Sequence, residues 1–179
     1  MATIHIGEIK AIAQKAHCDA TLRESLFADM QSSERETAVQ AAWALTHLPA
    51  IDNCHIDAHR ETLVSLAIST PDVSLRRITL TLLERLDWQA SNVDETPEYY
   101  VALLDFCFEH LLLPDETYGV RSLCMKLAYK ISLPFPELLD ELRQSLLLIE
   151  PTDLGAGVRH TRNKLLKQLI NIDNEKIQL

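Results

Sequence analysis

The sequence predicts an all-α protein built from a repeated helical hairpin. Only 4 glycines occur among 179 residues, which favours helices over a sheet with many tight turns. Arginine also recurs at intervals of 41, 45 and 38 residues, and each arginine opens a similar helical pattern. A period of about forty residues is typical of helical hairpins that stack into a solenoid. The four periodic arginines are Arg35, Arg76, Arg121 and Arg159.

Each periodic arginine marks the start of the second helix of a hairpin. Counting from the residue before it, offsets 0, 4, 7, 8 and 11 fall on one helical face and are mostly apolar. We therefore expect each second helix to bury this face. The residues at these offsets are Glu34, Ala38, Ala41, Ala42 and Leu45; Leu75, Thr79, Leu82, Leu83 and Leu86; Val120, Cys124, Leu127, Ala128 and Ile131; and Val158, Arg162, Leu165, Leu166 and Leu169.

The remaining elements follow in chain order. Residues 4–16 predict an extra helix that caps the first hairpin, and the first helices of the four hairpins follow Asp19, Asn53, Pro97 and Pro136. Turns within the last three hairpins carry a proline and acids, which stop one helix and favour the start of the next. We expect a capping segment at residues 1–18, a repeat domain at 19–171 and a C-terminal tail at 172–179.

At these residues the chain resembles the HEAT-repeat family, within the wider class of HEAT and armadillo solenoids. The best matches are Val120-Arg121-Ser122-Leu123-Cys124 and Val158-Arg159, and the likeness covers residues 19–171. Glu34 and Arg162 depart from the pattern, as terminal repeats often do. The resemblance implies a right-handed α–α superhelix of about four hairpins with an extra N-terminal helix.

The resemblance also implies a structural role for the four arginines. In this family the arginine typically pairs with an acidic residue near the preceding turn, which would fix the stacking of the hairpins. The acids available for such a ladder of ion pairs are Asp72, Asp115 and Asp153.

In this family the second helices line the concave side, so residues opposite the buried stripe are candidates for binding a partner. Apolar and aromatic side chains recur there, and the last hairpin offers cations instead. Such a surface suits a protein or peptide with an acidic segment. The apolar positions could equally pack between neighbouring repeats. The candidate residues are Val39, Trp43, Leu80, Met125, Lys126, Tyr129, His160, Lys164 and Lys167.

Charge narrows the choice of partner. The net charge of −9 argues against nonspecific nucleic-acid binding, which needs a basic footprint. The charge is uneven, since residues 91–150 carry 11 acids against 4 bases, whereas residues 151–179 carry 3 acids against 5 bases. The C-terminal repeat is therefore a basic patch on an acidic body. Self-association through a terminal hairpin is a further option.

The chain shows no secretory signal, no apolar run long enough to span a bilayer and no paired cysteine spacing. We therefore expect a cytoplasmic protein without membrane contact. His55 and His59 have a spacing that suits a metal, but no further ligand is specified, so we predict no metal and no cofactor.

No phosphate-binding loop or hydrolase motif occurs, and we predict a non-catalytic interaction or scaffold module. The alternative is a nucleic-acid-binding protein or a DNA base-excision enzyme. Some HEAT-like solenoids excise alkylated bases with concave aromatic, acidic and basic side chains. Trp43, Glu84, Tyr129, Lys164 and Lys167 are the residues that such an activity would use here.

Overall fold

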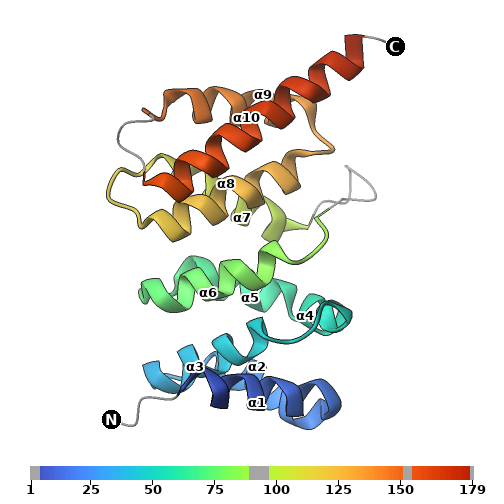
Figure 1. Cartoon of the computed structure of the whole chain (residues 1–179), viewed down its shortest axis with the longest axis vertical. Helices are drawn as coiled ribbons and strands as arrows, with labels where there is room; N and C mark the ends of the chain where they lie inside the picture. Colours follow the sequence, from blue (N-terminus) through green and yellow to red (C-terminus); the bar gives the residue numbers. More distant parts are fainter. Residues whose placement is uncertain (1–4, 89–96, 151–154, 178–179) are drawn as a thin grey trace. The chain divides into compact units, whose positions relative to one another are not determined.

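The computed structural model describes residues 5–88, 97–150 and 155–177, with side chains up to residue 172. Every regular element in these ranges is a helix, as the sequence predicts (Figure 1). The chain divides into two compact units, Met1–Leu86 and Asp87–Leu179.

Unit 1 contains two hairpins and the N-terminal helix. Helix α1 contacts both helices of the first hairpin, α2 and α3, as expected of a cap. The second hairpin is formed by α5 and α6, and α6 packs against α3, so that the second helices of the two hairpins lie side by side. The elements are α1 (Ile6–Cys18), α2 (Ala20–Asp29), α3 (Arg35–Thr46), the 3-10 turn η1 (Ala50–Asp52), α4 (Asn53–Asp57), α5 (Arg60–Ser69) and α6 (Val73–Glu84).

Unit 2 repeats the arrangement with longer helices. Helices α7 and α8 form one hairpin, and α9 and α10 form the other. The second helices again pack together, α8 against α10, and α7 contacts α9. The elements are α7 (Glu98–Leu112), α8 (Tyr118–Ser132), α9 (Pro136–Leu148) and α10 (Ala156–Ile177).

Two helix boundaries differ from the sequence prediction. The segment after Asn53, predicted as one helix, is broken at residues 58 and 59 into α4 and α5. The His59 ring at this break stacks on Phe27 of α2, with ring centroids 3.9 Å apart, and its Nε2 lies 3.0 Å from a Glu24 carboxylate oxygen. These contacts hold the break against the neighbouring helix. Helix α10 also continues to Ile177, beyond the predicted end of the repeat domain at residue 171.

The predicted stripes of the second helices form most of the core. Burying them supplies the main driving force for stacking, because each removes apolar surface from water. Trp88, which follows α6 in the chain, is also in the core, where its ring meets Tyr100 edge-on at 4.8 Å between centroids. The buried stripe residues are Ala38, Ala41, Ala42 and Leu45; Leu75, Thr79, Leu82, Leu83 and Leu86; Val120, Cys124, Leu127, Ala128 and Ile131; and Val158, Arg162, Leu165 and Leu169.

Arginines close the C-terminal ends of several helices. The last carbonyls of an α-helix have no partner within the helix, and a guanidinium can donate to them. Arg121 of α8 donates from Nε and Nη2 to the Leu111 carbonyl of α7, both at 3.2 Å. Arg76 of α6 donates to the Ala67 and Thr70 carbonyls at the end of α5, at 3.3 and 2.6 Å.

The other periodic arginines behave differently. Arg35 is exposed and forms an ion pair with Asp72, which lies in the turn of the following hairpin. Arg159 is also exposed, and the helix-closing role in the last hairpin falls to Arg162, whose Nε donates to the Leu146 carbonyl at 2.7 Å. Among the described contacts, Arg76 and Arg121 thus donate to helix-end carbonyls, and Asp72 pairs with the arginine of the preceding hairpin. Asp153 lies outside the described residues.

Two arginines outside the periodic set also donate hydrogen bonds to carbonyls at helix ends. Arg23 of α2 donates from Nη1 to the Ala16 and His17 carbonyls at the end of α1, at 2.9 and 3.3 Å. Arg85, just after α6, donates to the Leu45, Thr46, Leu48 and Pro49 carbonyls, which lie at or beyond the end of α3 in the neighbouring hairpin. Burial lowers the pKa of Arg85, with nearby Asp52 acting in the opposite direction.

Candidate partner-binding surface

The candidate surface of unit 1 lies on α3 and α6. Val39 and Trp43, one turn apart on α3, are both partly exposed. The Trp43 ring lies 6.2 Å from the His47 ring, centroid to centroid, on the same helical face. Two apolar side chains are thus available to a ligand without unfolding the helix.

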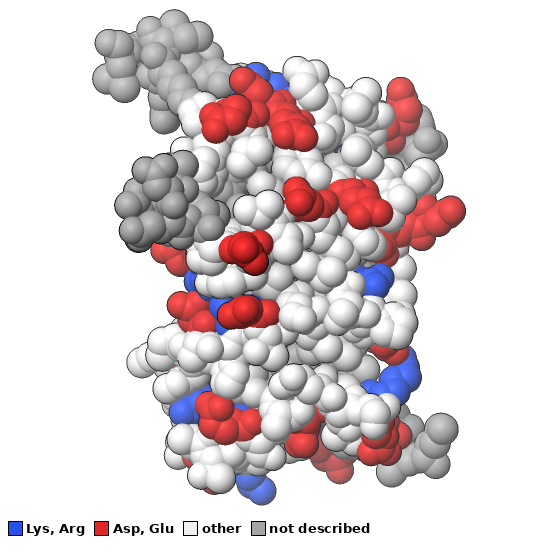
Figure 2. Space-filling model, turned by 180° about the vertical axis from the view of Figure 1, so that it is seen from behind, with Lys and Arg blue, Asp and Glu red and all other residues white. Residues whose placement is uncertain are grey.

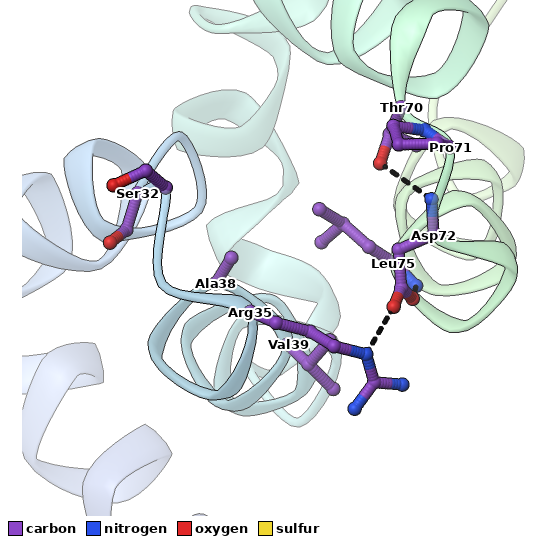
Figure 3. Close-up of a pocket in the computed structure, with 9 residues that line it drawn as sticks. Ser32, Arg35, Ala38, Val39, Thr70, Pro71, Asp72 and Leu75 are labelled. Atoms are coloured by element: carbon purple, nitrogen blue, oxygen red, sulfur yellow. Dashed lines mark hydrogen bonds and ion pairs between the residues drawn. The ribbon is translucent and has the colours of Figure 1, made fainter.

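A pocket opens beside Val39 (Figure 3). It has a volume of about 480 Å³ and lies between the start of α3 and the turn that leads into α6. The Arg35–Asp72 ion pair spans its edge, and Ala38 and Leu75 contribute apolar side chains. The lining residues are Ser32, Ser33, Arg35, Ala38, Val39, Thr70, Pro71, Asp72 and Leu75.

Asp72 organises this pocket. Its carboxylate caps α6 by accepting the Leu75 N–H at 2.8 Å, and its own backbone N–H donates to the Thr70 hydroxyl at 3.2 Å (Figure 3). The bond from Leu75 is the main cause of a lowered pKa for Asp72; burial opposes it and Arg35 reinforces it. Asp72 is therefore ionised at neutral pH and holds the two hairpins at the pocket edge.

The candidate surface of unit 2 lies on α8 and α10. Lys126 and Tyr129 of α8 are partly exposed, and His160, Lys164 and Lys167 of α10 are exposed. Partial burial raises the pKa of the Tyr129 hydroxyl, so the group is neutral at physiological pH and can donate a hydrogen bond.

A hydroxyl pair joins the two helices of this surface. The Ser122 and Thr161 hydroxyl oxygens lie 2.8 Å apart, and the Thr161 hydroxyl donates to the Gly157 carbonyl at 3.1 Å. A second pocket, of about 450 Å³, opens at the starts of α8 and α10 around this pair. The surface is therefore made by two helices in fixed register.

Two predicted contact residues belong to the core instead. Leu80 of α6 and Met125 of α8 both have 0% exposed surface. Both occupy offset five, counted as before from the residue that precedes the periodic arginine, and packing between neighbouring repeats was the alternative given for such apolar positions. This is a correction to the predicted site, because a side chain with no exposed surface cannot contact a partner unless the helices separate.

The structure also places the predicted metal candidates. His59 is occupied by its stacking on Phe27 and its bond to Glu24, and His55 is partly exposed. Within residues 5–88, 97–150 and 155–172 no group of three or more His, Cys, Asp or Glu side chains is placed to hold a metal ion. In the same part of the chain no helix has the length and apolarity needed to cross a membrane.

Sequence reasoning missed the arginines that close helices outside the periodic positions. Arg162 carried a usable signal, because it stands at offset four in a stripe that is otherwise buried. A charged residue in such a stripe must find hydrogen-bond partners, and the nearest available ones are the free carbonyls of the preceding helix. Arg23 and Arg85 gave no comparable signal.

Helical hairpins whose second helices pack against one another, as α3 does on α6 and α8 on α10, are typical of an α-solenoid. The chain belongs to the HEAT repeat domain family, whose model matches residues 1–169. No curated protein matches the sequence. The predicted all-α solenoid class is thus confirmed, and HEAT repeat domains are generally interaction or scaffold modules rather than enzymes.

Proposed function

We propose that the protein is a non-catalytic interaction module that binds a partner protein or peptide on its second helices. The observation that carries the proposal is the pair of partly exposed apolar side chains, Val39 and Trp43, beside the open pocket of about 480 Å³. A pocket lined in part by Val39, with a partly exposed tryptophan one turn further along the same helix, is the kind of site that anchors an interface.

The helices that carry this surface are held in place before any partner arrives. The Arg85 bonds and the Arg35–Asp72 ion pair join the two hairpins of unit 1. Preorganisation lowers the entropy cost of docking, since only the partner then has to become ordered. In unit 2, α8 and α10 are likewise packed together, and Tyr129 is a partly exposed aromatic residue of this surface.

We further propose that the module acts in the cytoplasm. Cys18, Cys54, Cys107 and Cys124 are all free thiols, which suits a reducing compartment. Burial raises the pKa of the Cys107 thiol, and a bond with Cys124 acts in the same direction, so Cys107 is a packing residue rather than a nucleophile.

The proposal is tested by affinity capture from the source cell with wild-type protein and the double variant Trp43→Ala with Tyr129→Ala. We expect the wild type to retain a defined partner and the double variant to lose it, because each substitution removes an aromatic contact of one unit. Circular dichroism checks that the helices of both proteins remain intact.

A matched control removes an exposed apolar side chain from each unit outside the candidate surface. Ile51 and Leu148 are 78% and 75% exposed, so Ile51→Ala with Leu148→Ala changes a comparable amount of surface. This control should retain the partner. If the Trp43 and Tyr129 variant retains the same partner as the control, the proposed surface is wrong.

A further inference from the structure

We infer that the face of unit 2 formed by α8 and α10, here called the cationic face, binds an acidic segment of a partner protein. The inference rests on the proposed interaction function and specifies the chemistry of one of its two surfaces. Positive and negative side chains are divided unevenly among the four helices of unit 2.

The second helices of unit 2 carry only positive charge on their described side chains. Neither α8 nor α10 up to residue 172 contains an aspartate or glutamate. Lys126 and Lys164 occupy offset six of their respective helices, and Tyr129 and Lys167 occupy offset nine. Lys126 follows Ser122 by one turn on α8, and Lys164 follows Thr161 by one turn on α10. Because the Ser122 and Thr161 hydroxyls meet at 2.8 Å where the two helices pack, the lysines lie on adjoining sides of the two helices.

The lysines of this face are available to a ligand. Lys164 and Lys167 are exposed and lie on one side of α10 with His160, while Lys126 is partly exposed. No described acidic residue forms an ion pair with Lys126, Lys164 or Lys167. An incoming carboxylate would therefore not have to displace an existing partner from these ammonium groups.

The first helices of unit 2 carry the opposite charge. Arg143 is the one Lys or Arg in α7 and α9, and it lies 3.3 Å from an Asp140 carboxylate oxygen. Figure 2 shows red acidic side chains spread over the face on the α7 and α9 side. The exposed acids of these helices are Glu98, Asp105, Glu109, Glu137, Asp140 and Glu141.

This division of charge favours an acidic partner and determines on which side of unit 2 it docks. An acidic segment is attracted to the cationic face and repelled by the acidic one, so charge complementarity allows docking on one side of unit 2. The second helices of unit 1 do not share the property, since Glu36 of α3 and Glu84 of α6 accompany their arginines. The acid-binding surface is thus specific to the last two hairpins.

A protein segment fits this face better than a nucleic acid does. The Tyr129 ring offers an apolar surface and a neutral hydroxyl beside the lysines, which suits a peptide that mixes carboxylates with apolar side chains. A nucleic acid needs cations along many successive phosphates, and the net charge of −9 opposes a polyanion beyond this short face.

The test uses a short fluorescein-labelled peptide of Glu, Leu and Ala, titrated with the full chain and followed by fluorescence anisotropy. We expect saturable binding that weakens with added salt, because the contacts are exposed charges. Lys164→Glu with Lys167→Glu should weaken binding about tenfold, since each reversal exchanges an attraction for a repulsion. Lys126→Glu, on the neighbouring helix, should weaken it in the same direction.

A matched control reverses two exposed lysines elsewhere. Lys10→Glu with Lys15→Glu on α1 makes the same change in net charge in unit 1 and should leave peptide binding unaltered. A peptide with Lys in place of Glu should not bind the wild type. Absence of saturable binding of the acidic peptide, or equal weakening by both charge-reversal pairs, would overturn the inference.

A single-stranded DNA oligonucleotide forms the last arm of the experiment. Binding of DNA as tightly as the acidic peptide would overturn the choice of a protein segment. The proposed function is judged separately, by partner capture with the Trp43 and Tyr129 variant. If that variant loses its partner while Lys164→Glu with Lys167→Glu leaves peptide binding unchanged, the interaction module stands and the acidic specificity fails.

Discussion

Replacing Arg121 by alanine tests whether an arginine of the repeat holds the hairpin together by closing a helix. Arg121 is 4% exposed, and both Nε and Nη2 donate to the Leu111 carbonyl, near the last residue of α7. Alanine would leave this carbonyl without the donor and would leave a space where the side chain now packs.

The contacts of Arg121 determine how much stability the substitution should remove. Both donors share one acceptor, so we count them as one bond from a charged group, which contributes about 1.5–3 kcal/mol. Losing the buried methylene groups of the side chain adds up to about 1 kcal/mol. The free energy of unfolding should therefore fall by about 1.5–4 kcal/mol. With a urea dependence of about 2 kcal/mol per molar, this corresponds to a decrease of about 1–2 M in the urea midpoint.

The assay is urea unfolding followed by tryptophan fluorescence in a Trp43→Phe background. The chain has 2 tryptophans, so this background leaves Trp88, buried against Tyr100, as the reporter of unit 2. Circular dichroism on the same samples follows the loss of helix. Both signals should move to lower urea concentration when Arg121 is replaced.

Arg159 and Arg162 provide the comparison. Arg159 occupies the equivalent sequence position in the last hairpin but is exposed, and its replacement by alanine should change stability by no more than about 0.5 kcal/mol. Arg162→Ala should resemble Arg121→Ala, because Arg162 donates to the Leu146 carbonyl of α9. A larger loss for Arg159→Ala than for Arg162→Ala would refute the reasoning.

Two further predictions concern burial and pH. Leu80→Ala and Met125→Ala should each lower the free energy of unfolding by about 2–5 kcal/mol, as measured in urea, because both side chains lie in the core; a cost below about 1 kcal/mol would show that they are surface residues after all. Glu116 accepts a bond from His110 at 2.6 Å; burial opposes its ionisation, but bonds from His110 and the Thr117 backbone outweigh burial and lower its pKa. The unfolded carboxyl, with its usual pKa of 4.5, then binds a proton before the folded one does, so the stabilisation is present above that pH and is lost as the pH falls through the lower folded value. Glu116→Gln should therefore lower the free energy of unfolding by about 1 kcal/mol at neutral pH, as measured by urea unfolding. The difference in free energy between the variant and the wild type should shrink below pH 4.5, and a difference independent of pH would contradict this role.

The hairpin architecture was predictable because every stacked repeat must bury the same helical face. That requirement places apolar residues at the same offsets in every second helix, and the buried residues from Ala38 to Leu169 follow this pattern. The match extends to helix starts, where Asp72 caps α6 and Pro136 is the first residue of α9.

The roles of individual arginines could not be predicted from their spacing. Whether a guanidinium reaches a free carbonyl depends on the length of the turn and on the rotation of the second helix about its axis. In the last hairpin this rotation brings Arg162, rather than Arg159, to the end of α9. Sequence period alone fixes neither quantity.

The candidate surface was predictable only in part, for a related reason. Offset five faces away from the stripe of its own hairpin, but whether it meets water depends on how closely the neighbouring helices approach. Leu80 and Met125 are buried at this offset, whereas Val39 remains partly exposed next to the pocket. The exposure of the lysines at offsets six and nine was predictable without knowing how closely the helices approach, because charged side chains seldom enter a core unpaired.

Hydrogen exchange of the full chain with and without the acidic peptide shows whether the cationic face is where an acidic segment binds. We expect slower exchange in peptides covering residues 118–132 and 156–172, the described α8 and α10 segments, when the acidic peptide is bound. Slower exchange confined to α7 and α9, or no change in either pair of helices at saturating peptide, would contradict it.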